Sequence, residues 1–195
     1  NNMSHFTRKF WQVLGLVSLS SGCLAACQPH QEASNANKTA SATQTNTSSQ
    51  KQEAGQSLSG TFQDIHGKTY KLEDLRGKKV YIKFWASWCS ICLAGLKDVD
   101  ALADESNQGN EVVVLSMVAP EIRNEKPLAD FTKWFSGLDY THLPVLVDQS
   151  GDFMKQLGVV AYPTSAFINS KGELVKVQLG HMDRQSVLDQ LASMD

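Results

Sequence analysis

The sequence predicts an α/β fold in which helices flank a mixed central β-sheet. Three observations support this class. Segments with the β-branched and aromatic composition of strands alternate with segments of helical periodicity from residue 79 to residue 169. A hairpin pattern precedes this region, and a second hairpin followed by a helix ends it. The segment 58–195, which holds all these patterns, is long enough to bury a single hydrophobic core.

Each strand is predicted from a run such as 79-KVYIKFW-85, and each helix from apolar residues that recur every three or four positions. The recurrence of Leu93, Leu96, Val99 and Leu102, for example, predicts one helix over 90–105. Strands are expected, in chain order, at 61–63, 69–71, 79–85, 111–118, 144–148, 164–169 and 173–179, and the other helices at 127–135, at 152–158 and from about residue 183.

The first 27 residues are predicted to be a secretory leader. Arg8 and Lys9 form its positive start, and residues 10–19 form an apolar core that is too short for a membrane span. The leader ends in 24-LAAC-27, which resembles the lipobox of bacterial lipoproteins, where cleavage precedes a cysteine whose sulfur is lipidated. We therefore expect Cys27 to anchor an extracytoplasmic protein to a bacterial membrane. An ordinary signal peptide is the alternative.

Residues 28–57 contain almost no large apolar side chains, as 35-NANKTASATQTNTSSQKQ-52 illustrates. Such a segment cannot bury enough surface to offset the entropy of ordering, so a disordered linker is predicted before a folded domain at 58–195. The net charge of the chain is −2, and no basic surface that would bind nucleic acid is expected.

The stretch 84-FWASWCSIC-92 places Cys89 and Cys92 two residues apart. A structural metal site needs four ligands, but the domain has no further cysteine, and His66, His142 and His181 stand singly, so no metal is expected. A permanent disulfide here would close too small a loop to stabilise the fold much. The pair is therefore predicted to be redox-active, with no other cofactor.

The pair lies where a strand ends and a helix begins, and the unpaired N–H groups of a helix N-terminus lower the pKa of a thiol. On this interpretation Cys89 is the exposed nucleophile, and Cys92, inside the first turn, is the resolving cysteine. Trp85 is expected to pack in the core. Trp88 is expected to form the rim of the recognition surface.

The residues 83-KFWASWCSIC-92, together with 162-YPT-164, resemble the thioredoxin fold. The segments 117-MVAPE-121, 130-DFTKWFSGLDY-140 and 143-LPVLVD-148 extend the similarity to the N-terminal thioredoxin-like domain of PilB-type methionine sulfoxide reductases, within the TlpA/ResA group of exported thiol reductases. The resemblance covers roughly residues 60–195. It implies that Pro163 is cis and faces the cysteine pair, while Tyr162 offers backbone groups to an incoming peptide.

Three positions depart from these relatives. Ser90-Ile91 stands where thioredoxin has Gly-Pro, Lys83 where it has a buried aspartate, and Gly95 where TlpA/ResA-like proteins commonly have glutamate. If Lys83 is buried, burial lowers its pKa, and its neutral form could accept a proton from Cys92. The alternative is a lysine that keeps its charged end in water.

These observations predict an extracytoplasmic thiol–disulfide oxidoreductase that reduces disulfides in partner proteins. The resemblance implies a methionine sulfoxide reductase as its client and a transmembrane reductase of the CcdA/DsbD kind as its electron donor. A reductant for apocytochrome c and a disulfide-forming oxidase are alternatives. A metal or haem chaperone is the alternative outside enzymes, but it would need a histidine or methionine ligand beside the pair.

Overall fold

The structure is a computed structural model that describes residues 55–195. The predicted leader with its lipidation site Cys27, and residues 28–54 of the predicted linker, lie outside the described residues. No helix within 55–195 has both the length and the apolar character needed to cross a membrane.

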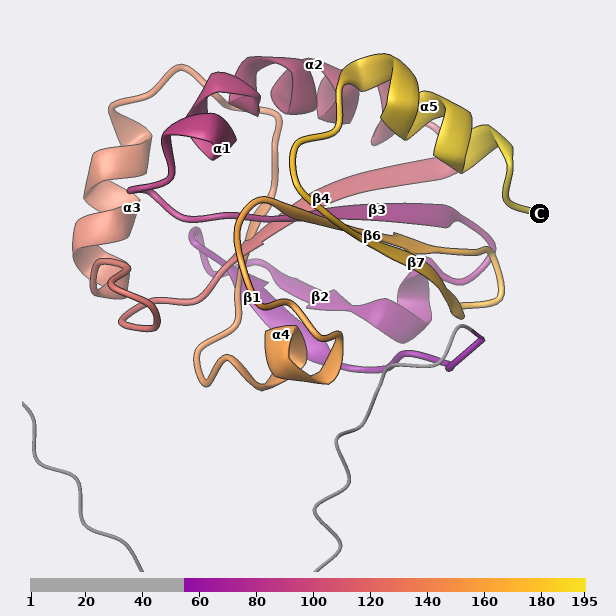
Figure 1. Cartoon of the computed structure of the whole chain (residues 1–195), viewed down its shortest axis with the longest axis horizontal. Helices are drawn as coiled ribbons and strands as arrows, with labels where there is room; N and C mark the ends of the chain where they lie inside the picture. Colours follow the sequence, from indigo (N-terminus) through magenta and orange to yellow (C-terminus); the bar gives the residue numbers. More distant parts are fainter. Residues whose placement is uncertain (1–54) are drawn as a thin grey trace, which may run out of the picture. The chain divides into compact units, whose positions relative to one another are not determined.

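The described residues form one seven-stranded sheet in the order β2-β1-β5-β4-β3-β6-β7 (Figure 1). The pairs β3–β4 and β4–β5 are parallel, and the remaining neighbours are antiparallel, so the sheet is mixed as predicted. The strands are β1 (Thr61–Asp64), β2 (Thr69–Lys71), β3 (Lys79–Phe84), β4 (Val112–Val118), β5 (Val145–Val147), β6 (Thr164–Ile168) and β7 (Leu174–Leu179). The helices are the 3-10 helix η1 (Leu72–Leu75) and the α-helices α1 (Ser90–Ala94), α2 (Leu96–Ser106), α3 (Leu128–Ser136), α4 (Asp152–Gln156) and α5 (Arg184–Ala192).

Hydrophobic clusters cover both faces of this sheet, and β3 contributes to each of them. Successive side chains of a strand point to opposite faces, so Tyr81 packs into the cluster beneath α1, α2, α3 and α5, whereas Ile82 and Phe84 pack toward α4. Figure 1 shows α1, α2 and α5 on one side of the sheet and α4 on the other. Just after β3, Trp85 is wholly buried near Phe131, which confirms its predicted place in the core. Strand alternation places Lys83 on the α1–α2 side as well.

The single helix predicted over 90–105 is wrong, because Gly95 divides it into α1 and α2. Glycine has a low helix propensity, and its N–H here closes a tight turn onto the Cys92 carbonyl at 3.2 Å. That carbonyl also accepts a hydrogen bond from the Lys83 ammonium group, which reaches it from another element. The periodicity of the apolar residues continues across the break and so did not reveal it.

The folded region includes residues 55–57, which their composition assigned to the linker. The N–H of Gly55 donates to the carbonyl of Leu174, the N–H of Leu174 donates to the carbonyl of Gln56, and Ser57 bridges Glu173. These bonds pair the segment with the outer edge of β7. Backbone pairing of this kind depends little on side chains, which is why composition did not indicate it.

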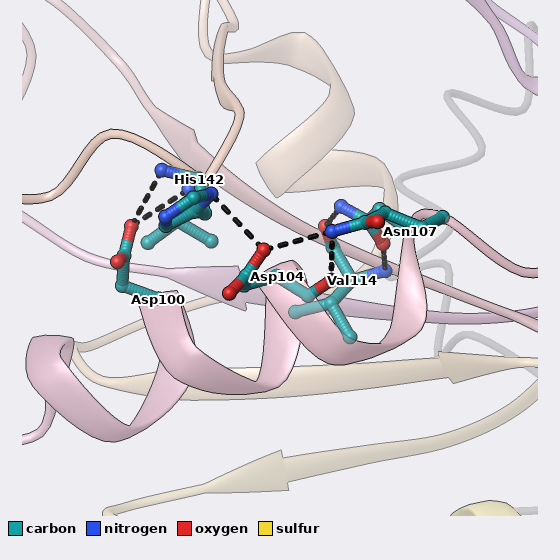
Figure 2. A network of polar contacts seen from close by, with 7 residues as sticks. Asp100, Asp104, Asn107, Val114 and His142 are labelled. Carbon is teal, nitrogen blue, oxygen red and sulfur yellow. Dashed lines mark hydrogen bonds and ion pairs between the residues drawn. The ribbon is translucent and has the colours of Figure 1, made fainter.

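A polar network joins α2 to β4 and to the segment before β5 (Figure 2). The buried Asp100 carboxylate accepts hydrogen bonds from the backbone N–H groups of His142 and of the next residue, at 2.9 and 2.8 Å. The His142 ring lies 3.2 Å from Asp104, and the Asn107 side chain makes two bonds with the backbone of Val114. The network fixes α2, and therefore the helix pair that carries the cysteines, against the parallel part of the sheet.

Candidate active site

The interior strand β3 leads to the cysteine pair, which follows its carboxyl end. Cys89 is the N-cap of α1 and Cys92 lies in its first turn, and the two are joined by a disulfide with Cα atoms 5.2 Å apart. Cys92 is completely buried, and Cys89 is 7% exposed. Cys89 is therefore the more accessible of the two, although it is far less exposed than the sequence suggested.

The backbone at the start of α1 is arranged to stabilise charge on the outer sulfur. The N–H of Cys92 points at Sγ of Cys89, at 3.3 Å. When the disulfide is reduced, this N–H group can donate to a Cys89 thiolate, and such a bond favours the ionised form. The geometry therefore suits Cys89 for nucleophilic attack and Cys92 for resolution.

Lys83 lies beneath the disulfide and is only 3% exposed, so the alternative that placed its charged end in water is wrong. Its Nζ donates to the Cys92 carbonyl at 3.1 Å. Burial lowers the pKa of Lys83 to about 8, and the carboxylate of Asp98 opposes this shift. The amine can therefore change its protonation state close to neutral pH, beside the backbone of the inner cysteine.

The Lys83 ammonium group packs against Gly95, where no side chain is present. A Cβ atom at Gly95 would lie 3.0 Å from Lys83 Nζ and 3.3 Å from Cε1 of His181. A larger residue would force both side chains to move. The two departures from the thioredoxin-like pattern, at positions 83 and 95, are thus parts of one local arrangement.

Above the disulfide, Trp88 and Tyr162 form the centre of an exposed rim. Their ring centroids are 5.9 Å apart, and the Trp88 indole N–H donates to the Arg123 carbonyl at 2.9 Å. The Arg123 guanidinium lies over the Tyr162 ring at 5.5 Å and donates to the Val159 carbonyl. The Tyr162–Pro163 peptide bond is cis, as the resemblance implied. The structure thus brings Trp88 and Tyr162 together and adds Arg123, which the sequence did not single out.

A buried glutamate holds the loop that carries Arg123. The Glu125 carboxylate accepts hydrogen bonds from the N–H of Ser87 at 2.7 Å, from the hydroxyl of Ser87 at 2.5 Å, and from the N–H of Lys126 at 2.7 Å. Non-glycine residues with positive φ in this loop are Glu121, Arg123 and Asn124. Charged residues in a loop are usually solvated, so the sequence contained no signal for the structural role of Glu125.

Large apolar side chains are exposed beside the cysteine pair. Trp88, Ile91 and Val160 are each more than half exposed. Together with Tyr162 we call them the recognition rim. Exposed apolar side chains next to a reactive group are suited to contact with a protein partner. Within 55–195, no group of three or more His, Cys, Asp or Glu side chains is arranged to hold a metal ion.

Comparison with known proteins identifies the family. The sequence profile described as Redoxin matches residues 36–192. The chain belongs to the Redoxin family.

Solved structures and named proteins that resemble this chain include a thioredoxin lipoprotein and thiol-disulfide oxidoreductases. The exposed lipoprotein thioredoxin of Streptococcus pneumoniae is 49% identical, with a TM-score of 0.67, over 70% of this chain and 100% of that chain. The N-terminal domain of PilB from Neisseria gonorrhoeae is 26% identical, with a TM-score of 0.62, over 68% of this chain and 87% of that chain. The thiol-disulfide oxidoreductase ResA of Halalkalibacterium halodurans is 28% identical over 133 residues, which are 68% of this chain and 71% of ResA. The thioredoxin-like fold and the resemblance to the ResA and PilB group are confirmed, and the protein is a thiol–disulfide oxidoreductase.

The lowered pKa of Lys83 predicts a particular dependence of stability on pH. Between pH 8 and 10.5 the unfolded chain binds more protons at this lysine than the folded protein does, so the free energy of unfolding rises with pH in that window. Below pH 8 the charged buried amine costs up to about 3 kcal/mol. We expect oxidised Lys83→Met to be about 1–3 kcal/mol more stable than wild type at pH 7 in urea denaturation, with a smaller advantage at pH 9.5.

The matched control is Lys176→Met, which removes an exposed lysine from β7. Its effect on stability should be small and nearly the same at both pH values. An advantage of Lys83→Met that is equally large at pH 7 and pH 9.5 would show that Lys83 is not an amine with a lowered pKa.

Proposed function

We propose that this protein is a membrane-anchored, extracytoplasmic reductant of disulfides in partner proteins. The observation that carries the proposal is the Cys89–Cys92 disulfide at the start of α1, beside the recognition rim and above the buried Lys83. The cysteine pair is the electron carrier in this proposal, and no further cofactor takes part.

In the proposed reaction the reduced protein begins with Cys89 as a thiolate. Its sulfur attacks one sulfur of the client disulfide, the client S–S bond breaks, and the released client thiolate takes up a proton. Cys92 then loses its proton and attacks Sγ of Cys89. The mixed disulfide breaks, the second client thiolate leaves and is protonated, and the Cys89–Cys92 disulfide forms. Two electrons have passed from the cysteine pair to the client, and its two thiolates have taken up protons from the surrounding water.

Lys83 is proposed to receive the proton of Cys92. With a pKa of about 8, about one-tenth of the amine is neutral at pH 7 and able to act as a base. The charged form supports the reverse step, in which a donor reduces the disulfide and Cys92 leaves as a thiolate that must be protonated. A group with a pKa near the working pH can serve in both directions.

The proposed client is a methionine sulfoxide reductase, whose turnover leaves a disulfide that must be reduced. The sequence resemblance to PilB-type methionine sulfoxide reductases suggests this client, and the likeness to the solved N-terminal domain of PilB supports the choice. The proposed electron donor is a transmembrane reductase of the CcdA/DsbD kind. A reductant for apocytochrome c would use the same chemistry on another client, and an oxidase would run it in the opposite direction.

Membrane attachment is proposed through lipidated Cys27, at the end of 24-LAAC-27. A similar protein of Streptococcus pneumoniae is described as an exposed lipoprotein, which supports this part of the proposal. Two acyl chains would make the attachment stable.

Trapping of the mixed disulfide tests the cysteine roles and the client together. Cys92→Ser removes the resolving sulfur and leaves the attacking one, so client proteins should accumulate as covalent adducts in cells that make this variant. Cys89→Ser should trap little, because Cys92 is completely buried. Mass spectrometry of the adducts should find an exported methionine sulfoxide reductase.

If apocytochrome c were the only protein found in the adducts, the proposed mechanism would stand, but the proposed client would be wrong. Stronger trapping by Cys89→Ser would reverse the roles of the two cysteines. The variant that lacks both sulfurs is the control for adducts that form through other thiols.

Membrane fractionation tests the anchor. Full-length Cys27→Ala should leave the membrane fraction or retain its leader, because its processing and lipidation both require the cysteine sulfur. The control is Cys23→Ala, which changes a cysteine inside the predicted leader and should leave the mature protein on the membrane. Unchanged processing and fractionation of Cys27→Ala would contradict the proposed anchor.

A further inference from the structure

Two side chains from distant parts of the chain converge on the face of Gly95. Lys83 extends from β3, and His181 lies between the end of β7 and the start of α5. A Cβ atom at residue 95 would be 3.0 Å from Lys83 Nζ and 3.4 Å from Nδ1 of His181. The absence of a side chain at this one position therefore leaves the buried amine and the imidazole next to the same small space.

The two groups differ in their access to water. Lys83 is 3% exposed, whereas His181 is an exposed residue. In the proposed reaction each turnover moves a proton onto or off Lys83, so the buried amine must exchange protons with the solvent. An imidazole can accept a proton at one ring nitrogen and release one from the other, and it is well placed here to connect the amine with water.

We propose that His181 is the proton relay of Lys83 and carries protons between the buried amine and the solvent through the gap at Gly95. The proposal rests on the reductant function proposed above and deepens it. When Cys92 becomes a nucleophile, its proton passes to Lys83 and then to His181, which releases it to water. In the reverse reaction the proton follows the opposite route, and no electrons move in this step. His181 thus affects the reaction only by exchanging protons with Lys83.

The charged groups around the pair are suited to this role. Asp98 on α2 attracts the Lys83 ammonium group, and Asp183, the N-cap of α5, faces His181. Hydrogen bonds from Ser186 lower the pKa of Asp183 most, and His181 adds a smaller effect in the same direction. Each of the two side chains therefore has a carboxylate that interacts with it, Asp98 for Lys83 and Asp183 for His181. Tyr81 lies on the same face of β3 as Lys83, and the cysteine pair lies on α1, whose Cys92 carbonyl accepts the hydrogen bond of the amine.

A two-phase thiol assay can separate the relay from the rest of the mechanism. Reduced protein is mixed with the disulfide reagent dithiobis(nitrobenzoate), and released thionitrobenzoate is followed by absorbance. Attack by Cys89 releases the first equivalent in a phase that depends on reagent concentration. Attack by Cys92 on the mixed disulfide releases the second equivalent in a phase whose rate is independent of reagent concentration.

His181→Ala should leave the first phase unchanged and slow the second about five- to tenfold at pH 7, less than the loss of a direct acid–base catalyst would cause. Added imidazole should restore the second phase in proportion to its concentration, because a small base can enter the opened space. Gly95→Ala should slow the second phase too, because its methyl group would displace both Lys83 Nζ and the His181 ring slightly, and imidazole should not rescue it, since the His181 ring is still in place.

The matched control is His66→Ala, an exposed histidine in the β1–β2 turn, which should change neither phase. In a Lys83→Met background, His181→Ala should have no further effect, because the relay then has no amine to serve. The proposal would be overturned if the second phase of His181→Ala were as fast as that of the wild type. It would also be overturned if imidazole failed to relieve the slowing and the effect of His181→Ala added to that of Lys83→Met. A wild-type protein without a second phase would refute the reductant mechanism itself.

Discussion

A buried ammonium group beneath a disulfide is the constraint on which this active site depends. Lys83 lies on the interior strand β3, where its charge is almost wholly removed from water, so it needs a hydrogen-bond acceptor and space. The Cys92 carbonyl accepts its hydrogen bond, and the absence of a side chain at Gly95 leaves space for the amine. The burial of this group lowers the pKa of Lys83 to about 8, and the break between α1 and α2 lies at Gly95, against which the amine packs.

The recognition rim is stabilised by a separate set of interactions on the outer side of the cysteine pair. The hydrogen bonds between Glu125 and Ser87 hold the loop of residues 119–126 in place. This loop positions Arg123, whose carbonyl accepts a hydrogen bond from Trp88 and whose guanidinium lies over the Tyr162 ring. The disulfide therefore lies between the buried Lys83 amine, which is proposed to handle protons, and the exposed apolar side chains of the recognition rim, which are proposed to contact partners.

The periodicity of apolar residues predicted the order and type of the strands and helices because each pattern depends on local geometry. The cysteine pair, the buried Trp85 and the exposed Trp88 were also predictable from local motifs, whereas the cis bond before Pro163 was expected from the family resemblance. The break at Gly95 was not, because it involves a lysine twelve residues earlier on another element. The same reason explains why Glu125 was missed: its partner, Ser87, is brought to it only by the fold.

The central claim is that the Cys89–Cys92 pair donates electrons to partner disulfides. The direction of electron flow is set by the reduction potential of this pair relative to those of its partners, and the most direct test is to measure that potential by equilibration with a thiol–disulfide buffer of known poise. A reductant should have a potential near that of thioredoxin, about −270 mV. A value above about −150 mV, close to that of the oxidant DsbA, would contradict the account and make the protein a source of disulfides.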